Sequence, residues 1–160
     1  MAEVTLREVT AETVRLGDLN RDGAPDLLFV QSVDGTREIT CLTATTITGG
    51  LLWQTGAPDP DNGHIYGDLP VQVGDWDGDG NNEVLYVRQA TYVEPYDWGG
   101  YARERAARYA GQAQLVVLDG ATGQPKAHLP LPAPADDCFL LADLTGRGCR
   151  RDLVVKDRYW

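Results

Sequence analysis

The sequence is poor in the side chains that most hydrolases use as nucleophiles. Its 160 residues include one serine, Ser32, which does not lie in a G-x-S-x-G motif. The two histidines, His64 and His128, lie in separate sequence contexts, one in a polar loop and one in an expected strand. A hydrolase with a serine nucleophile and a histidine base is therefore disfavoured.

Positive charge and long apolar runs are also scarce. Lysine and arginine number 14 against 24 aspartates and glutamates, and the formal net charge is -10. Because binding to nucleic acid needs a basic patch, nucleic acid is not expected as a partner. No apolar run is long enough for a membrane span, and the first residues lack the basic and apolar layout of a signal peptide.

Three cysteines leave the redox state open. Cys41 lies within an expected strand and is predicted to be a small core residue. Cys138 and Cys149 flank the last expected hairpin, where they either pair in a disulfide or remain free.

Two acidic segments of equal length are the main motifs. Residues 18–26 read D-L-N-R-D-G-A-P-D, and residues 75–83 read D-W-D-G-D-G-N-N-E. Each is followed by an apolar stretch whose β-branched and aromatic residues indicate a strand. Oxygens at loop positions 1, 3 and 5 converge if the backbone curls around a cation, and a glycine at position 6 allows the sharp turn. The pattern predicts a cation-binding loop within a β-hairpin.

These loops differ from an EF-hand. An EF-hand has helices on both sides and a bidentate carboxylate at position 12, where this chain has Phe29 and Tyr86. The closing carboxylate is instead at position 9, as Asp26 or Glu83. Ordinary acidic turns are the alternative, but two copies in register favour a cation, because carboxylates this close repel one another. Neither loop contains histidine or cysteine, so calcium is favoured over zinc, and its flexible coordination favours it over magnesium.

The pattern D-x-[DN]-x-D-G-x-x-[DE] between strands resembles the FG-GAP repeats, also called integrin α-type or VCBS repeats, which form blades of calcium-binding β-propellers. The resemblance implies a Ca²⁺ ion held by the side chains at positions 1, 3, 5 and 9 and by the backbone carbonyl at position 7. The implied ligands are Asp18, Asn20, Asp22, Ala24 and Asp26 in the first loop, and Asp75, Asp77, Asp79, Asn81 and Glu83 in the second. We predict tighter binding in the second loop, which supplies four carboxylates where the first supplies three.

A third, eroded copy covers residues 143–152. Its position 5 is Arg147, and its closing acid is displaced by one residue to Asp152. A guanidinium can replace a cation but cannot ligate one. We therefore predict a hairpin tied by a salt bridge from Arg147 to Asp143 or Asp152, with no metal.

The spacing of the three loops predicts a repeated β unit. Between the first two loops, strands near 27–31, 37–43, 51–54 and 70–74 are expected to form one four-stranded antiparallel blade. After the second loop, strands are expected near 84–89, 113–118, 126–131 and 138–142, with an insertion at 94–111 that contains a short helix. The predicted fold is all-β, a single partial β-propeller domain over residues 1–160. A complete propeller has about 4–8 blades. The rest of the ring would come from a longer chain, which we favour, or from other copies.

The expected function is a calcium-stabilised binding or scaffold module with a carbohydrate or a protein as ligand. Free calcium is scarce in the cytosol, so an extracellular, periplasmic or cell-surface location is expected. The alternative is part of a polysaccharide lyase, because similar loops occur in the catalytic propellers of rhamnogalacturonan lyases. That resemblance covers the acidic loops alone, and no residue is assigned as the catalytic base.

Overall fold

The structure is a computed structural model that describes part of the chain. The described residues are 9, 11, 13–33, 38–62, 68–89, 113–132, 135 and 138–155. The predicted helical insertion at 94–111 lies outside them.

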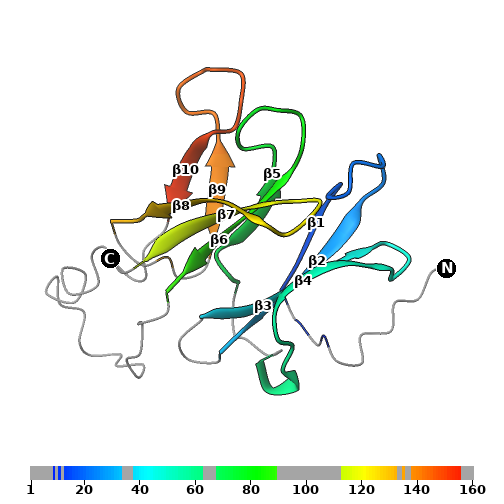
Figure 1. The fold of residues 1–160 in the computed structure, drawn as a ribbon. Helices are drawn as coiled ribbons and strands as arrows, with labels where there is room; N and C mark the ends of the chain where they lie inside the picture. The colour runs from blue at the N-terminus through cyan, green and yellow to red at the C-terminus, as the bar shows by residue number, and fades with distance from the viewer. Residues whose placement is uncertain are drawn as a thin grey trace, which may run out of the picture.

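The described residues form two four-stranded antiparallel sheets and one two-stranded hairpin (Figure 1). The first sheet has the strand order β1-β2-β3-β4, with β1 Thr13–Gly17, β2 Asp26–Ser32, β3 Ile39–Thr46 and β4 Leu51–Gly56. The second has the order β5-β6-β7-β8, with β5 Val71–Gly74, β6 Glu83–Arg88, β7 Gln114–Asp119 and β8 Pro125–Pro130. The hairpin pairs β9 Phe139–Ala142 with β10 Asp152–Val155.

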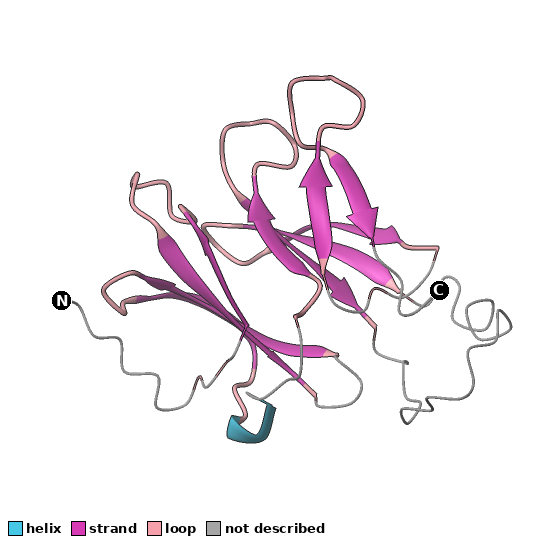
Figure 2. Cartoon of the chain, turned by 180° about the vertical axis from the view of Figure 1, so that it is seen from behind, coloured by secondary structure: helices cyan, strands magenta, loops and turns pink. Residues whose placement is uncertain are grey.

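The antiparallel all-β architecture confirms the coarse prediction of fold class. In this part of the chain the helical structure is one short 3₁₀ turn, Pro60–Asn62 (Figure 2). The sheets that the structure describes do not close into a ring.

The predicted grouping of strands into blades is wrong by one strand. The strand near 70–74 was assigned to the first blade, but β5 pairs with β6 and begins the second sheet. The reason is local: a short acidic loop joins β5 to β6, with Gly74 opposite Glu83, as Gly17 is opposite Asp26 in the first sheet. Strands joined by a tight loop pair with each other. The longer connection after β4 therefore crosses to the next sheet.

The first strands of the three units, β1, β5 and β9, lie next to one another (Figure 1). A repeated hydrogen bond links them. Arg15 Nε donates to Val71 O at 2.9 Å, and Gln72 Nε2, at the equivalent position of the next sheet, donates to Phe139 O at 3.0 Å. Gly17 also faces β5, and a Cβ at this position would collide with Val73. Each unit thus contacts the next through its first strand.

The two central strands of the second sheet, β6 and β7, are buried on both faces. The core between the two larger sheets contains Leu28, Val30, Leu42, Ala44, Trp53, Val71, Val84, Val116 and Leu118. The core between the second sheet and the β9–β10 hairpin contains Leu85, Val87, Leu115, Val117 and Phe139. Successive residues of β6 and β7 enter opposite cores, as the alternation of side chains along a strand requires. The second sheet therefore lies between the first sheet and the β9–β10 hairpin, and the packing on both sides holds the two strands that carry its acidic loop.

Candidate metal-binding loops

The three acidic loops lie at the same end of the molecule, at the top of Figure 1. Each joins the first strand of its unit to the second strand. The apolar strands pair in antiparallel register and hold the two ends of each loop together, so the loop must reverse direction over a few polar residues.

Position by position, the first two loops share four hydrogen bonds from backbone N–H groups to side chains. The aspartate side chain at position 1 accepts hydrogen bonds from the backbone N–H groups of positions 4 and 6. The side chain at position 3 accepts one from the N–H of position 5, and the side chain at position 5 accepts one from the N–H of position 7. In the first loop the donor–acceptor pairs are Arg21 N and Gly23 N to Asp18, Asp22 N to Asn20, and Ala24 N to Asp22. In the second they are Gly78 N and Gly80 N to Asp75, Asp79 N to Asp77, and Asn81 N to Asp79. Two segments 57 residues apart in sequence thus share one local structure.

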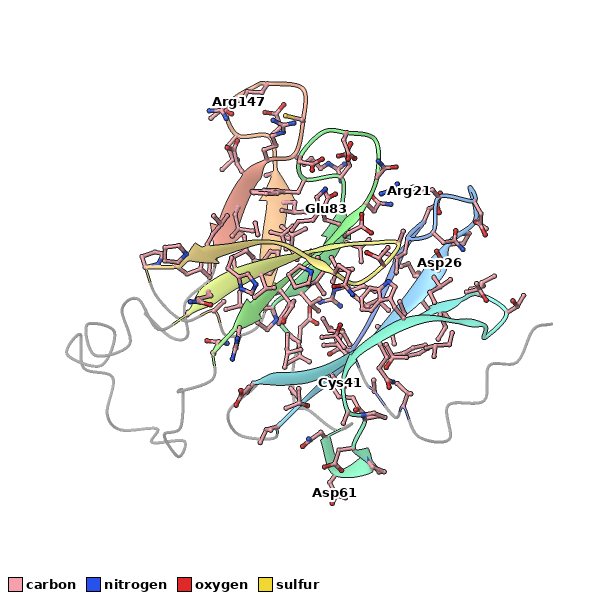
Figure 3. All side chains as sticks on the ribbon, viewed as in Figure 1. Arg21, Asp26, Cys41, Asp61, Glu83 and Arg147 are labelled. Carbon is pink, nitrogen blue, oxygen red and sulfur yellow. The ribbon has the colours of Figure 1, made fainter. Side chains whose placement is uncertain are left out.

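The closing carboxylates at position 9 are almost completely buried. Asp26 and Glu83 each have 1% of their surface exposed, and each is the first residue of the second strand of its sheet (Figure 3). One oxygen of each accepts the N–H groups of loop positions 2 and 3. The donors are Leu19 (2.8 Å) and Asn20 (3.1 Å) in the first loop, and Trp76 (2.9 Å) and Asp77 (3.4 Å) in the second. The other oxygen of each carboxylate is left for a further partner.

The second loop brings three of its predicted ligands together. Asp75, Asp77 and Glu83 each offer one oxygen, and these oxygens lie within 4.8 Å of one another. Three carboxylates in this arrangement can hold a metal ion. Asp79 extends from the same loop, and Asn81 is held through its N–H as described above.

A lysine that sequence reasoning missed reaches into this cluster. Lys126 Nζ lies 2.6 Å from Asp77 Oδ2, 2.8 Å from Glu83 Oε1 and 4.0 Å from Asp79 Oδ2. These contacts raise the pKa of Lys126 above its ordinary value, the hydrogen bond to Asp77 contributing most, and the same bond lowers the pKa of Asp77. Lys126 comes from β8, more than 40 residues along the chain from Glu83. A motif confined to the loop gives no signal for it.

A second cation lies outside the loop. The Arg151 guanidinium rests against Gly78, where a Cβ would collide with it, and its charge also lowers the pKa of Asp77. The positive φ of Gly78, 78°, favours glycine at this position independently.

The first loop is arranged differently at position 3. Asn20 Oδ1 accepts the N–H of Asp22, and Asn20 Nδ2 donates to Asp22 Oδ2 at 3.0 Å. Among the described residues, Asp18, Asp22 and Asp26 do not converge as closely as the three acids of the second loop. Arg21 extends away from the loop and pairs with Asp119 at 3.1 Å.

The third loop does not contain the predicted salt bridge. Within the described part of the chain, no ion pair joins Arg147 to Asp143 or Asp152, so that prediction is wrong. Backbone donors take its place: Arg147 N and Gly148 N each donate to Asp143 at 2.8 Å, and Leu144 N donates to Asp152 at 2.7 Å. The loop keeps the hydrogen bond from the position 6 N–H to the position 1 aspartate, and it keeps the backbone hydrogen bonds to the closing acid. These bonds form without the guanidinium of Arg147.

Replacing Arg147 by alanine is therefore expected to change the free energy of unfolding by less than about 0.5 kcal/mol, because the backbone N–H is retained. Urea denaturation of the Arg147→Ala protein measures this. Asp152→Ala is the matched control. It removes the acceptor of the Leu144 N–H and should cost about 1 kcal/mol, as loss of a capping side chain does. A loss above about 1 kcal/mol for Arg147→Ala would reveal a guanidinium contact that the structure does not contain.

The cysteines are all free. Cys41 is buried in β3 as predicted, and burial raises the pKa of its thiol. Cys138 and Cys149 are free and partly exposed, so the optional disulfide between them is not formed.

A hollow of about 690 Å³ lies beside the first strands, next to the second loop. Its lining combines apolar and polar side chains, among them Leu16, Val73, Leu140, Leu141, Asp75 and Asn82. Because these residues come from three repeats, local sequence patterns do not reveal the hollow.

Comparisons with known proteins assign no family. No protein-family model matches the chain, and no curated protein matches it. Among solved structures, the rhamnogalacturonan lyase PL11 of Bacillus licheniformis is similar to it, with a TM-score of 0.48 and 20% sequence identity over 76% of this chain. The match spans 23% of the length of that lyase. A likeness at this level assigns no function. In the described part of the chain, no helix is long and apolar enough to cross a membrane.

Proposed function

We propose that the chain is a calcium-binding segment of the FG-GAP/VCBS propeller type, which serves as a binding or scaffold module of a secreted or cell-surface protein. The observation that carries the proposal is the hydrogen-bond pattern shared by the two loops. In both, backbone N–H groups hold one side of the acidic side chains, and the closing carboxylate is buried.

The closing carboxylate of the first loop has an oxygen that could bind a cation. Asp26 is 1% exposed, and its Oδ2 accepts two backbone N–H groups, while none of the described residues donates to its Oδ1. A cation that reaches this second oxygen would offset the repulsion between Asp26 and the neighbouring acids of the loop. The atoms of the loop that are proposed to ligate the metal are all oxygens, which suits Ca²⁺ and not Zn²⁺.

The relation between neighbouring units supports the propeller type. The same side-chain to backbone hydrogen bond links β1 to β5 and β5 to β9. Four-stranded antiparallel sheets that repeat one contact with the next sheet are compatible with the radial repetition of blades in a propeller. The remaining blades would come from the same chain or from other copies, and the hollow beside the first strands would receive a carbohydrate or protein ligand. The lyase alternative stays a prediction, which absorbance by unsaturated products from pectic substrates would test.

Thermal unfolding in calcium and in EDTA tests the calcium proposal. A ligand at a free concentration a hundred times its Kd stabilises the native state by about 2.7 kcal/mol per site, so calcium is expected to raise the melting temperature. Magnesium at equal concentration should raise it much less, because Mg²⁺ demands near-ideal octahedral geometry and keeps its water. Equal melting temperatures in calcium and in EDTA would overturn the proposal.

A further inference from the structure

The Lys126 ammonium occupies the side of the second loop that a metal ion would use. Asp77 Oδ1 accepts the N–H of Asp79, while Asp77 Oδ2 contacts Lys126. Glu83 Oε2 accepts two backbone N–H groups, while Glu83 Oε1 contacts Lys126. The ammonium therefore binds the carboxylate oxygens that the loop's own hydrogen bonds leave free.

The first sheet has no lysine at the matching position. Lys126 is the second residue of β8, and Leu52 is the second residue of β4. The two sheets have the same strand order, and each has a register shift at the same place in the pairing of its last two strands. Leu52 packs against the core between the sheets. Among the described residues, the closing carboxylate of the first loop thus has no ammonium partner where Glu83 has one.

We propose that Lys126 is an intramolecular cation of the second loop that competes with a divalent ion, so that the first loop is the tighter metal site. This inference rests on the proposed calcium binding. It reverses the ranking expected from the number of carboxylates, because a metal entering the second loop must first displace a cation already bound to two of its four acids.

The spacing of the acids agrees with this assignment. The three acids of the second loop converge while Lys126 lies among them. The acids of the first loop form no ion pair with a described residue, and they stay further apart. Carboxylates repel one another when no positive charge lies between them. For the first loop to coordinate a metal, the Asn20 amide must turn so that Oδ1 instead of Nδ2 faces Asp22. The turn exchanges two exposed hydrogen bonds, from Asn20 Nδ2 to Asp22 Oδ2 and from Asp22 N to Asn20 Oδ1, for a metal contact.

Calorimetric titration of the intact chain with calcium tests the competition. Lys126→Met should raise the affinity of the weaker site about tenfold, since it removes a charge-assisted pair that the metal must otherwise break. Leu52→Met is the matched control and should leave both affinities unchanged. Asp22→Ala should remove the tighter binding phase of the parent protein, and Asp79→Ala the weaker one.

Melting curves in EDTA provide the second measurement. Lys126→Met should melt at a lower temperature than the parent, because its loop acids are then close together without a cation, and calcium should restore most of the difference. If Lys126→Met binds calcium no more tightly than the parent, or if Asp79→Ala removes the tighter phase, the competition is overturned while the calcium proposal stands. If neither the parent nor Lys126→Met binds calcium, both proposals fail. Equal melting temperatures in EDTA would overturn the role of Lys126 as a resident cation.

Discussion

Replacement of Trp53 by alanine is expected to lower the free energy of unfolding by about 3–5 kcal/mol, the usual cost of truncating a buried large aromatic. Trp53 is 8% exposed and belongs to β4, yet its Nε1 donates to Gly120 O of the second sheet at 2.6 Å. Its ring also lies against Gly123, where a Cβ would collide with it. The change would remove the ring and the hydrogen bond that join the two sheets.

Urea denaturation in EDTA measures this effect without a contribution from metal. Trp53→Phe is the matched control: it keeps an aromatic ring but loses the N–H, so its cost should be about 1–3 kcal/mol, the penalty of an unsatisfied buried acceptor. Small domains are stable by about 5–15 kcal/mol, so Trp53→Ala should leave a clearly weakened fold. A loss below about 1 kcal/mol would contradict the packing of β4 against the second sheet.

The double variant Asp26→Asn/Glu83→Gln is expected to lose the whole stabilisation by calcium, about 2.7 kcal/mol per site at a hundredfold excess over Kd. Each substitution removes the buried charge that closes its loop, and charge count is a main determinant of calcium affinity in such loops. The amide oxygens can still accept the N–H groups that Asp26 and Glu83 accept now, so the sheets should be retained in EDTA. Glu83→Gln also removes the ion pair with Lys126, so the double variant should melt below the parent in EDTA, and its calcium response is measured against its own melting temperature.

The measurement is the difference between the melting temperatures in calcium and in EDTA, with circular dichroism to establish that the sheets are retained. Asp143→Asn is the control. It makes a similar change at the first position of the third loop, where no metal is proposed, and should keep the full calcium response. A double variant that gains as much from calcium as the parent would show that the ion binds elsewhere.

The three loops form a series in how their carboxylates are compensated. The first has a buried closing carboxylate, Asp26, with one oxygen free of the described donors. The second has an ammonium from β8 at the corresponding oxygen of Glu83. In the third, backbone N–H groups bind Asp143 and Asp152, and the position 5 acid is absent. The same hairpin loop thus occurs with three different arrangements around its carboxylates, and the sequence of the loop alone distinguishes only the third.

The sequence by itself determined the local structure. The apolar stretches rich in β-branched and aromatic residues give the strands, which the structure places near the predicted ranges, and the order of Asp, Asn and Gly in each loop gives its turn. These features depend on residues within about ten positions of one another. Side-chain acceptors bind backbone donors two to five residues away, so a short segment contains all the information needed.

Only the tertiary structure decided which groups from distant segments meet at the loops. The assignment of β5 to the second sheet depends on which strands pair, and the approach of Lys126 to Glu83 depends on the register across three strands. The guanidinium of Arg147 was predicted from loop chemistry to bind a neighbouring acid, but backbone donors were already in place there. Charge compensation acts through space, so the number of acids in a loop predicts its chemistry only when the folded neighbours bring no charge of their own.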